Sequence, residues 1–305
     1  MTEGSFQQPE IASEPMKNLK CAVLMTCHDR PYHTIPAVLN IIAALERSRF
    51  IPLVFLIDSS EGSETIDGLA SVRRATLRYR RVAQDVFWAR GMKTAETMAI
   101  SSRELNENDV ILWLNDDVVL DRNAITIAQD CWERVNSADT ILVGATREEN
   151  SSEISYSGKN RLRSSPTSFL NSVPGGSLSP VGTFNGNFVW MSVGRAKFLG
   201  GIDGDFVHHG ADIEYGIRNE LNQGWNLLLG EPIGSCSSVK PNNPVSAGVL
   251  FHLFSPLSPL HLGTKKVMLQ KIGFTPAGAF VFATLETIAS SLRQLLSRVM
   301  GVKRE

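Results

Sequence analysis

The sequence has few cysteines, no excess of charge and no long apolar run, and each absence narrows the class of protein. Its four cysteines form no CxxC pair, so neither a zinc site nor a disulfide framework is predicted, and a reducing cytoplasm is the favoured location. The 30 basic and 31 acidic residues give a formal net charge of -1, without the basic excess typical of nucleic-acid-binding domains. No segment reaches the roughly 20 apolar residues that a membrane span needs.

The phosphate-binding loop GxxxxGK[ST] is also absent from these 305 residues, which argues against a phosphotransfer enzyme of that class. The hydrophobic content of 43% and the charged content of 20% are ordinary for a soluble globular protein. We expect a flexible tail over residues 1–19, a main domain over 20–236 with halves at about 20–145 and 146–236, and a C-terminal helical extension over 237–305.

The first half of the main domain alternates short apolar runs with segments of helical periodicity. Such alternation is typical of an α/β fold with a mostly parallel sheet and helices on both faces. The predicted strands are 21–26, 52–57, 75–79, 110–114 and 141–144, and the predicted helices are 34–44, 63–71, 92–102 and 123–135.

Polar residues follow three of these strands: TCHDR at 26–30, DSSEG at 58–62 and NDD at 115–117. Parallel strands bring their carboxyl ends to one edge, where such sheets bind ligands. The NDD triplet taken alone also suits a turn. Together with its neighbours it favours a site for a hard cation such as Mg²⁺ or Mn²⁺, which takes oxygen ligands.

The second half has a different pattern. Residues 164–182 are rich in Ser, Pro and Gly, which predicts a long loop and a candidate lid. An apolar stretch follows at 184–191, then a short helix at 196–199. A further helix carries Ile213, Ile217 and Leu221 on one face, and a strand is predicted at 225–229.

Six motifs in order carry a resemblance to a known family. They are TCHDRP at 26–31, Asp58 after the second strand, VFWARGM at 86–92, LNDD at 114–117, FNGNFVWM at 184–191 and HHGADIEYGIR at 208–218. This series resembles glycosyltransferase family 2, in its rhamnosyltransferase-like bacterial branch, and covers roughly residues 20–236, most of the chain. The resemblance implies the GT-A fold, a Rossmann-like sheet with a donor half followed by an acceptor half.

The resemblance also implies an activity: metal-dependent, inverting transfer of a sugar from a UDP- or dTDP-sugar, with rhamnose suggested by the branch. The acceptor would be a glycan or a lipid-linked saccharide, and the cofactor Mn²⁺ or Mg²⁺. Asp117 matches the metal ligand, and Asn115 stands at the first position of D-x-D with less charge. His252 is a further candidate ligand.

Asp212 matches the general base of the family and Glu214 is the second candidate, while Ala211 replaces the usual glycine of that motif. Helix capping is the alternative role for Asp212. Glycosyl inversion needs such a base to take the proton of the acceptor hydroxyl. A non-catalytic module that binds sugar nucleotides or glycans on the same fold is the competing hypothesis.

The remaining site residues also follow from the resemblance, and each has a structural alternative. Asp58 suits an Asx turn, Trp88 and Trp190 suit a core, and Asn187 suits a role in fixing its loop. The expected donor-binding residues are Thr26, Arg30, Asp58, Trp88, Gly91, Asn115 and Asp116, and the expected acceptor-binding residues are Asn187, Trp190, His208 and His209.

The C-terminal residues match no motif of the family. Leu292, Leu295, Leu296 and Met300 recur at helical spacing among basic residues. This stripe suits packing on the chain's own domain, a homodimer interface, or peripheral contact with the inner face of an anionic membrane.

Overall fold

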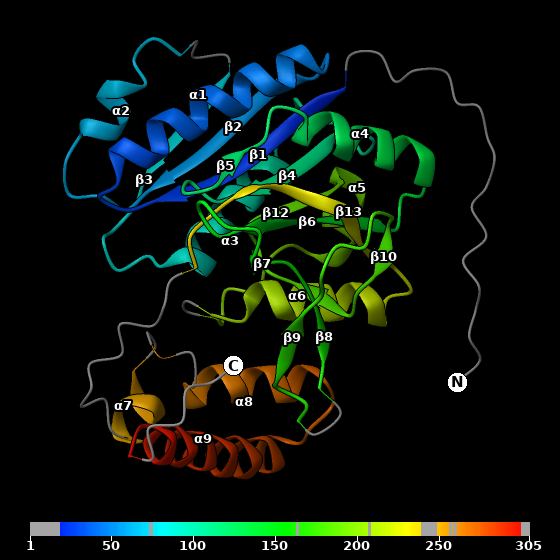
Figure 1. Cartoon of the computed structure of the whole chain (residues 1–305). Helices are drawn as coiled ribbons and strands as arrows, with labels where there is room; N and C mark the ends of the chain where they lie inside the picture. Colours follow the sequence, from blue (N-terminus) through cyan, green and yellow to red (C-terminus); the bar gives the residue numbers. More distant parts are fainter. Residues whose placement is uncertain are drawn as a thin grey trace.

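The computed structural model describes residues 19–72, 76–162, 165–206, 209–238, 249–255, 258 and 261–299, with backbone alone at 249, 250, 252 and 294–299. Figure 1 shows three layers of helix, sheet and helix, with a group of C-terminal helices below them.

The central sheet runs in the order β10-β13-β6-β12-β4-β1-β2-β3. Strands β1, β2, β3 and β4 are mutually parallel, and β13 runs parallel to β6. Strand β12 lies antiparallel between β4 and β6. The predicted mostly parallel α/β sheet is confirmed. The bounds are β1 Lys20–Cys27, β2 Ile51–Asp58, β3 Leu77–Arg81, β4 Val110–Leu114, β6 Thr140–Arg147, β10 Ser179–Pro180, β12 Phe188–Ser192 and β13 Trp225–Ser235.

Two short strands extend the sheet at its sides: β5 (Val119–Leu120) pairs with β13, and β7 (Ile154–Tyr156) pairs with β6. The inner strands are apolar along their whole length because both of their faces are covered. All five residues of β4 are buried, and Trp113 at its centre packs edge-on against Tyr215 with ring centroids 4.8 Å apart.

Helices cover both faces, as the sequence predicts. On one face α1 (Pro31–Arg47) and α4 (Ala124–Val135) bury residues such as Val38, Ile41 and Ala128. On the other, α3 (Trp88–Ile100), α5 (Val193–Leu199) and α6 (Ala211–Leu221) bury Met92 and Tyr215. The short α2 (Glu64–Gly68) lies beside α1.

Three helices begin earlier than predicted, and one of them, α5, begins at Val193 instead of residue 196. Helix α1 begins at Pro31 because proline has no N–H to lose and its fixed φ suits the first turn. Helix α3 begins at Trp88, so the aromatic-plus-glycine segment is its first turn. That turn packs tightly on the sheet: a Cβ on Gly91 would stand 2.7 Å from Cγ2 of Thr26.

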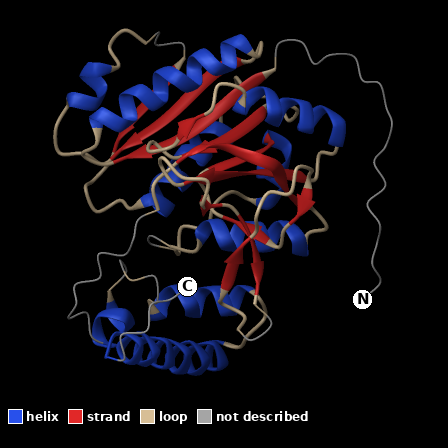
Figure 2. Cartoon of the chain, in the orientation of Figure 1, coloured by secondary structure: helices blue, strands red, loops and turns tan. Residues whose placement is uncertain are grey.

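The expected long loop over 164–182 is wrong in part, because short strands form within it. Strand β9 (Phe169–Asn171) pairs with β8 (Gly158–Arg161), which pairs with β11 (Thr183–Phe184) in a small second sheet, while β10 joins the central one. Figure 2 shows β8 and β9 reaching from the main body toward the C-terminal helices. There, the hydroxyls of Ser165 and Thr167 donate hydrogen bonds to Glu286. Backbone pairing and these anchors hold a segment whose composition suggests only flexibility.

The C-terminal helices are α7 (Val249–Phe254), α8 (Leu262–Lys271) and α9 (Pro276–Val299). Helix α8 joins them to the body: Met268 enters the core beneath α6, and Lys271 pairs with Asp203 at 2.6 Å. Helix α9 packs on α8, where Lys265 pairs with Glu286 at 3.2 Å. Within the described residues, none of the helices is long and apolar enough to cross a membrane.

Candidate functional site

The ends of β1, β2 and β4 meet at one edge of the sheet. The parallel register pairs Cys27 with Asp58, and the following loops bind one another. The backbone N–H of Asp29 donates to Oγ of Ser60 at 2.8 Å, and that of Glu61 donates to Oδ1 of Asp29 at 2.9 Å. Asp29 takes a left-handed φ of 48°, which Asp tolerates better than most residues. The predicted convergence of the three polar strand ends is present.

Arg30 brings the first loop onto the acidic triplet. Its guanidinium forms an ion pair with Asp116 and reaches Oδ2 of Asp117 at 3.2 Å. Oδ2 of Asp116 accepts a further hydrogen bond from Oγ1 of Thr34 at 2.7 Å. Asp116 is almost wholly buried, whereas the Asp117 side chain remains 26% exposed. The triplet is therefore an acidic corner with one accessible carboxylate.

The buried and the exposed carboxylate differ in their electrostatics. Burial raises the pKa of Asp116 to about 6, although the positive charge of Arg30 opposes this shift. The same two carboxylates raise the pKa of Arg30 although its own burial lowers it, so the guanidinium is held in the charged form. Sγ of Cys236 lies 3.6 Å from Oδ1 of Asp117 and closes the corner on its other side, a contact that the sequence does not reveal.

Asn115 links this corner to a second one. Its Oδ1 accepts a hydrogen bond from Nε1 of Trp88 at 2.8 Å. The indole of Trp88 lies against Gly186, where an added Cβ would stand 2.5 Å from the ring. The N–H of Gly186 donates to Oδ2 of Asp212 at 3.0 Å. The chain Asn115, Trp88, Gly186, Asp212 thus connects the triplet to the first turn of α6. Gly186 lies in the FNGNFVWM motif, but only its place between an indole and a carboxylate shows its part in the site.

Asp212 lies in this second corner, in the first turn of α6, and its side chain is half-buried. Its Oδ1 accepts from the N–H of Ile213 at 2.9 Å. Burial raises its pKa, while the two backbone hydrogen bonds and the charges of Lys159 and His209 lower it. Its side chain binds Gly186 across the corner, and α6 begins after Gly210 without a side-chain cap, so its capping role is limited to its own first turn.

Two of the expected site residues are structural. Glu214 is buried and forms an ion pair with Arg218: Nε of Arg218 lies 2.9 Å from Oε1 of Glu214. This pairing corrects the prediction of Glu214 as the second candidate base. Trp190 is fully buried in the middle of β12 and packs edge-on against Phe50 with centroids 5.3 Å apart. It does not form a wall of a sugar site, because its register position lies inside the sheet, opposite Leu112.

Three other expected site residues lie near the edge of the sheet and contact other residues of the protein. Asp58 is fully buried, and its oxygens accept from the N–H of Ser60 and the hydroxyl of Tyr79, each at 2.8 Å. That is the Asx turn that the sequence left open. Gly91 allows close helix–strand packing against Thr26. Asn187 is buried and fixes its loop: Nδ2 donates to Sγ of Cys236 at 3.5 Å.

The histidines contribute least. His208 lies outside the described residues, and His252 lies in α7, where only the backbone is described. His209 stands just before α6, near enough for its charge to act on Asp212. Within the described part of the chain, His, Cys, Asp and Glu side chains form no group of three or more that suits a metal ion.

The oxygen atoms of the triplet could supply only part of the coordination of a divalent cation. Asp117 offers one accessible carboxylate, while Asp116 is taken up by Arg30 and Thr34. Such a donor set does not suit an all-protein cage. It suits an Mg²⁺ or Mn²⁺ ion that takes its remaining oxygens from water and from a bound phosphate group.

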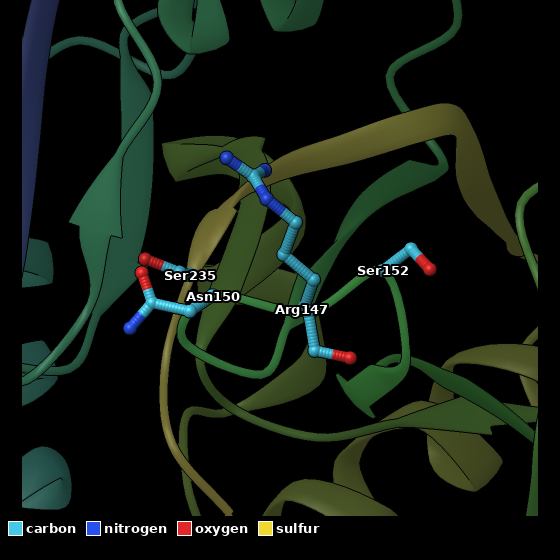
Figure 3. Close-up of a pocket in the computed structure, with 5 residues that line it drawn as sticks. Arg147, Asn150, Ser152 and Ser235 are labelled. Carbon is cyan, nitrogen blue, oxygen red and sulfur yellow. The ribbon is translucent and has the colours of Figure 1, made fainter.

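A polar hollow of about 580 Å³ opens beside this corner, at the ends of β6 and β13. Figure 3 shows Arg147, Asn150, Ser152 and Ser235 around it. The guanidinium of Arg147 also pairs with Asp121 at 2.7 Å. The hollow does not contain Asp212. It borders the triplet through Ser235, the neighbour of Cys236.

No protein family matches this sequence, and no curated protein is significantly similar to it. Its structure is similar to that of GalNAc-T7 with UDP, GalNAc and Mn²⁺, with a TM-score of 0.55 and 14% identity over 70% of this chain. It is also similar to residues 1–349 of TarS from S. aureus, with a TM-score of 0.55 and 13% identity over 93% of this chain. The matches cover 43% and 76% of those chains. The fold is that of the GT-A glycosyltransferases.

Proposed function

We propose that this protein is a metal-dependent, inverting glycosyltransferase that uses a nucleoside-diphosphate sugar. The observation that carries the proposal is the connected pair of corners: the acidic triplet and Asp212, joined through Trp88 and Gly186. The similar structure of GalNAc-T7 contains UDP and Mn²⁺, which supports the donor class. The specific donor, a UDP- or dTDP-sugar, and the transfer of rhamnose are both proposed from the sequence resemblance.

The charge distribution supports a diphosphate site at the triplet corner. Asp117 would hold Mn²⁺ or Mg²⁺, which neutralises the developing charge on the leaving diphosphate when bound. Arg30 is the one basic group within reach of Asp117 among its described contacts, and its planar guanidinium suits a bidentate contact to phosphate. Thr26 and Arg30 position the nucleotide at the end of β1. Trp88 orients Asn115 beside it.

Asp212 acts as the general base. A carboxylate with a raised pKa is a stronger base than an ordinary one. Two backbone N–H groups orient Asp212 without neutralising it as an adjacent arginine would. The acceptor hydroxyl would approach between Asp212 and the donor sugar, and a glycan or lipid-linked saccharide is the proposed acceptor.

The testing experiment is a thermal-shift titration of the full chain with UDP, dTDP and GDP, each with and without Mn²⁺. A ligand that binds the native state raises the melting temperature with concentration. We expect a shift for one nucleotide that is larger when Mn²⁺ is present. Equal, zero shifts for all three nucleotides with the metal would refute the proposal.

Transfer is then measured by release of the nucleoside diphosphate from the matching sugar nucleotide. Slow release by donor hydrolysis that depends on both Mn²⁺ and Asp212 supports an enzyme. Nucleotide binding without any release, under conditions where the donor saturates the protein and with acceptor extracts added, would instead establish the non-catalytic binding module.

A further inference from the structure

Helix α9 exposes several of its large apolar side chains and fully buries several small ones. Its inner face consists of Ala279, Ala283, Thr287 and Ser291, each at most 5% exposed. Its outer face presents Val281 at 56%, Leu285 at 63% and Leu292 at 46% exposure. An ordinary surface helix turns its large apolar residues inward.

This outer face is continuous rather than a set of scattered exposed residues. Positions 281, 285 and 292 follow one another at helical spacing, and Ile288 lies between them half-buried. Helix α9 is also the outermost layer of the C-terminal group, on the side of α8 away from the sheet (Figure 1). Its outer face therefore points away from the rest of the protein, and contiguous exposed apolar surface of this kind marks an interaction site.

The charged residues near the outer face of α9 indicate which kind of partner would bind there. Glu286 is the single acidic residue of α9, and it turns inward to Lys265, Ser165 and Thr167. Arg293, exposed, follows Leu292 directly. No carboxylate of α9 therefore stands on the outer face.

The whole C-terminal region is basic in a protein that is otherwise acidic. Residues 237–305 contain 8 of the 30 basic residues but only 2 of the 31 acidic residues. The formal charge of the chain is close to zero, so this excess is offset by acidic residues in the preceding part. A charge asymmetry of this kind favours an anionic partner for the C-terminal helices alone.

We infer that α9 lies flat on a membrane surface rich in anionic lipid, with Val281, Leu285 and Leu292 in the boundary between headgroups and acyl chains. An amphipathic helix with an apolar face and basic flanks binds such surfaces without crossing them. Anionic headgroups attract each nearby Lys or Arg. The sequence stripe at 292–300 pointed to this region, but the exposed face begins about three turns earlier, at Val281.

The experiment measures co-sedimentation of the full chain with vesicles. One set contains phosphatidylcholine alone and the other phosphatidylcholine with phosphatidylglycerol. We expect binding to the anionic vesicles that weakens as salt is raised, because salt screens surface charge. The double variant Val281→Glu/Leu285→Glu is expected to bind at least about tenfold more weakly, since it removes buried apolar surface and adds repulsion.

The matched control is Leu170→Glu/Val173→Glu, which places the same charges on residues that are 58% and 73% exposed outside α9. It is expected to bind vesicles like the original chain. Arg293→Gln is expected to weaken binding by about fivefold, the effect of one basic residue near an anionic surface. Both pairs of positions are exposed, and the circular dichroism spectrum and melting temperature verify that each variant is folded.

Three outcomes would overturn the inference. The first is equal binding by the α9 double variant and its control. The second is no binding to anionic vesicles at low salt. The third is a dimer in sedimentation velocity that only the α9 double variant dissociates, with no vesicle binding, because the face would then belong to a second copy. None of these measurements depends on transferase activity.

Discussion

The carboxylates in the two corners of the candidate site have different kinds of partner. At the triplet, Asp116 and Asp117 share an arginine, so negative charge is balanced by positive charge within hydrogen-bonding distance. At α6, Asp212 receives two backbone N–H groups and feels the more distant charges of Lys159 and His209, while burial raises its pKa. In the proposed function, the first corner holds the charge of the diphosphate and the second accepts the proton of the acceptor.

The largest expected effect tests the proton-accepting corner. Asp212→Asn should lower turnover by about 10²–10⁴-fold, the usual contribution of a general base, and leave nucleotide affinity unchanged. Glu220→Gln, an exposed change near the end of the same helix, is the control and should be neutral. Steady-state kinetics with a fluorescence titration of nucleotide separates the two effects. If nucleotide affinity falls while turnover holds, the roles of the corners are reversed.

The next effect tests the charge-holding corner. Asp117→Asn should weaken Mn²⁺-dependent nucleotide binding by about a hundredfold, at the upper end of what disturbing a metal's ligand environment costs. Nucleotide binding without metal should change little. Isothermal titration with and without Mn²⁺ measures both, and Asp130→Asn on the exposed side of α4 is the control. Unaltered Mn²⁺ dependence in Asp117→Asn would falsify the metal role.

The third prediction concerns the support beneath Asp212. Glu96 is fully buried and accepts hydrogen bonds from the N–H of Ile202 at 2.6 Å and the hydroxyl of Tyr215 at 3.0 Å. Burial raises its pKa from 4.5 to about 7. The folded state therefore keeps a proton that the unfolded state releases, so stability falls as pH rises from about 4.5 to about 7. The loss should be about 3 kcal/mol in full.

The matching variant is Glu96→Gln, which cannot ionise. Its amide can donate to the hydroxyl of Tyr215, which then turns toward Sδ of Met191, 3.3 Å away. We expect urea unfolding at pH 5 and pH 7.5 to show a much smaller difference for this variant than for the original chain. Glu46→Gln, exposed on α1, should leave the difference intact. The same slope in both variants would assign the pH dependence to another group.

The smallest effect concerns the support beneath the triplet edge. Tyr79→Phe removes the hydroxyl that donates to Oδ2 of Asp58 and leaves a buried carboxylate oxygen without that partner. It should lower the free energy of unfolding by about 1–2 kcal/mol and scarcely change nucleotide affinity, because Asp58 acts through its loop. Tyr32→Phe, at a side chain that is 71% exposed, is the control. A large loss of nucleotide affinity without loss of stability would restore Asp58 as a direct donor contact.

Local signals predicted the triplet corner well. Apolar runs that end in TCHDR, DSSEG and NDD identified three strands and the edge where they meet, because parallel strands fix which ends come together. The same signals failed for Trp190 and Glu214. Type and position along the chain did not distinguish a tryptophan inside a strand from one at its end, or a free acid from one paired with Arg218 four residues later.

The sequence by itself determined the alternation of strands and helices, the parallel edge and the acidic triplet, since these depend on neighbours within a few residues. Only the tertiary structure decided which acid is paired and which is accessible, because pairing depends on residues far apart in the chain: Arg30 with Asp116, and Gly186 with Asp212. It also decided which side of α9 faces outward. Helical periodicity marks the faces of a helix, but the packing of other elements, α8 foremost, determines which of them is covered.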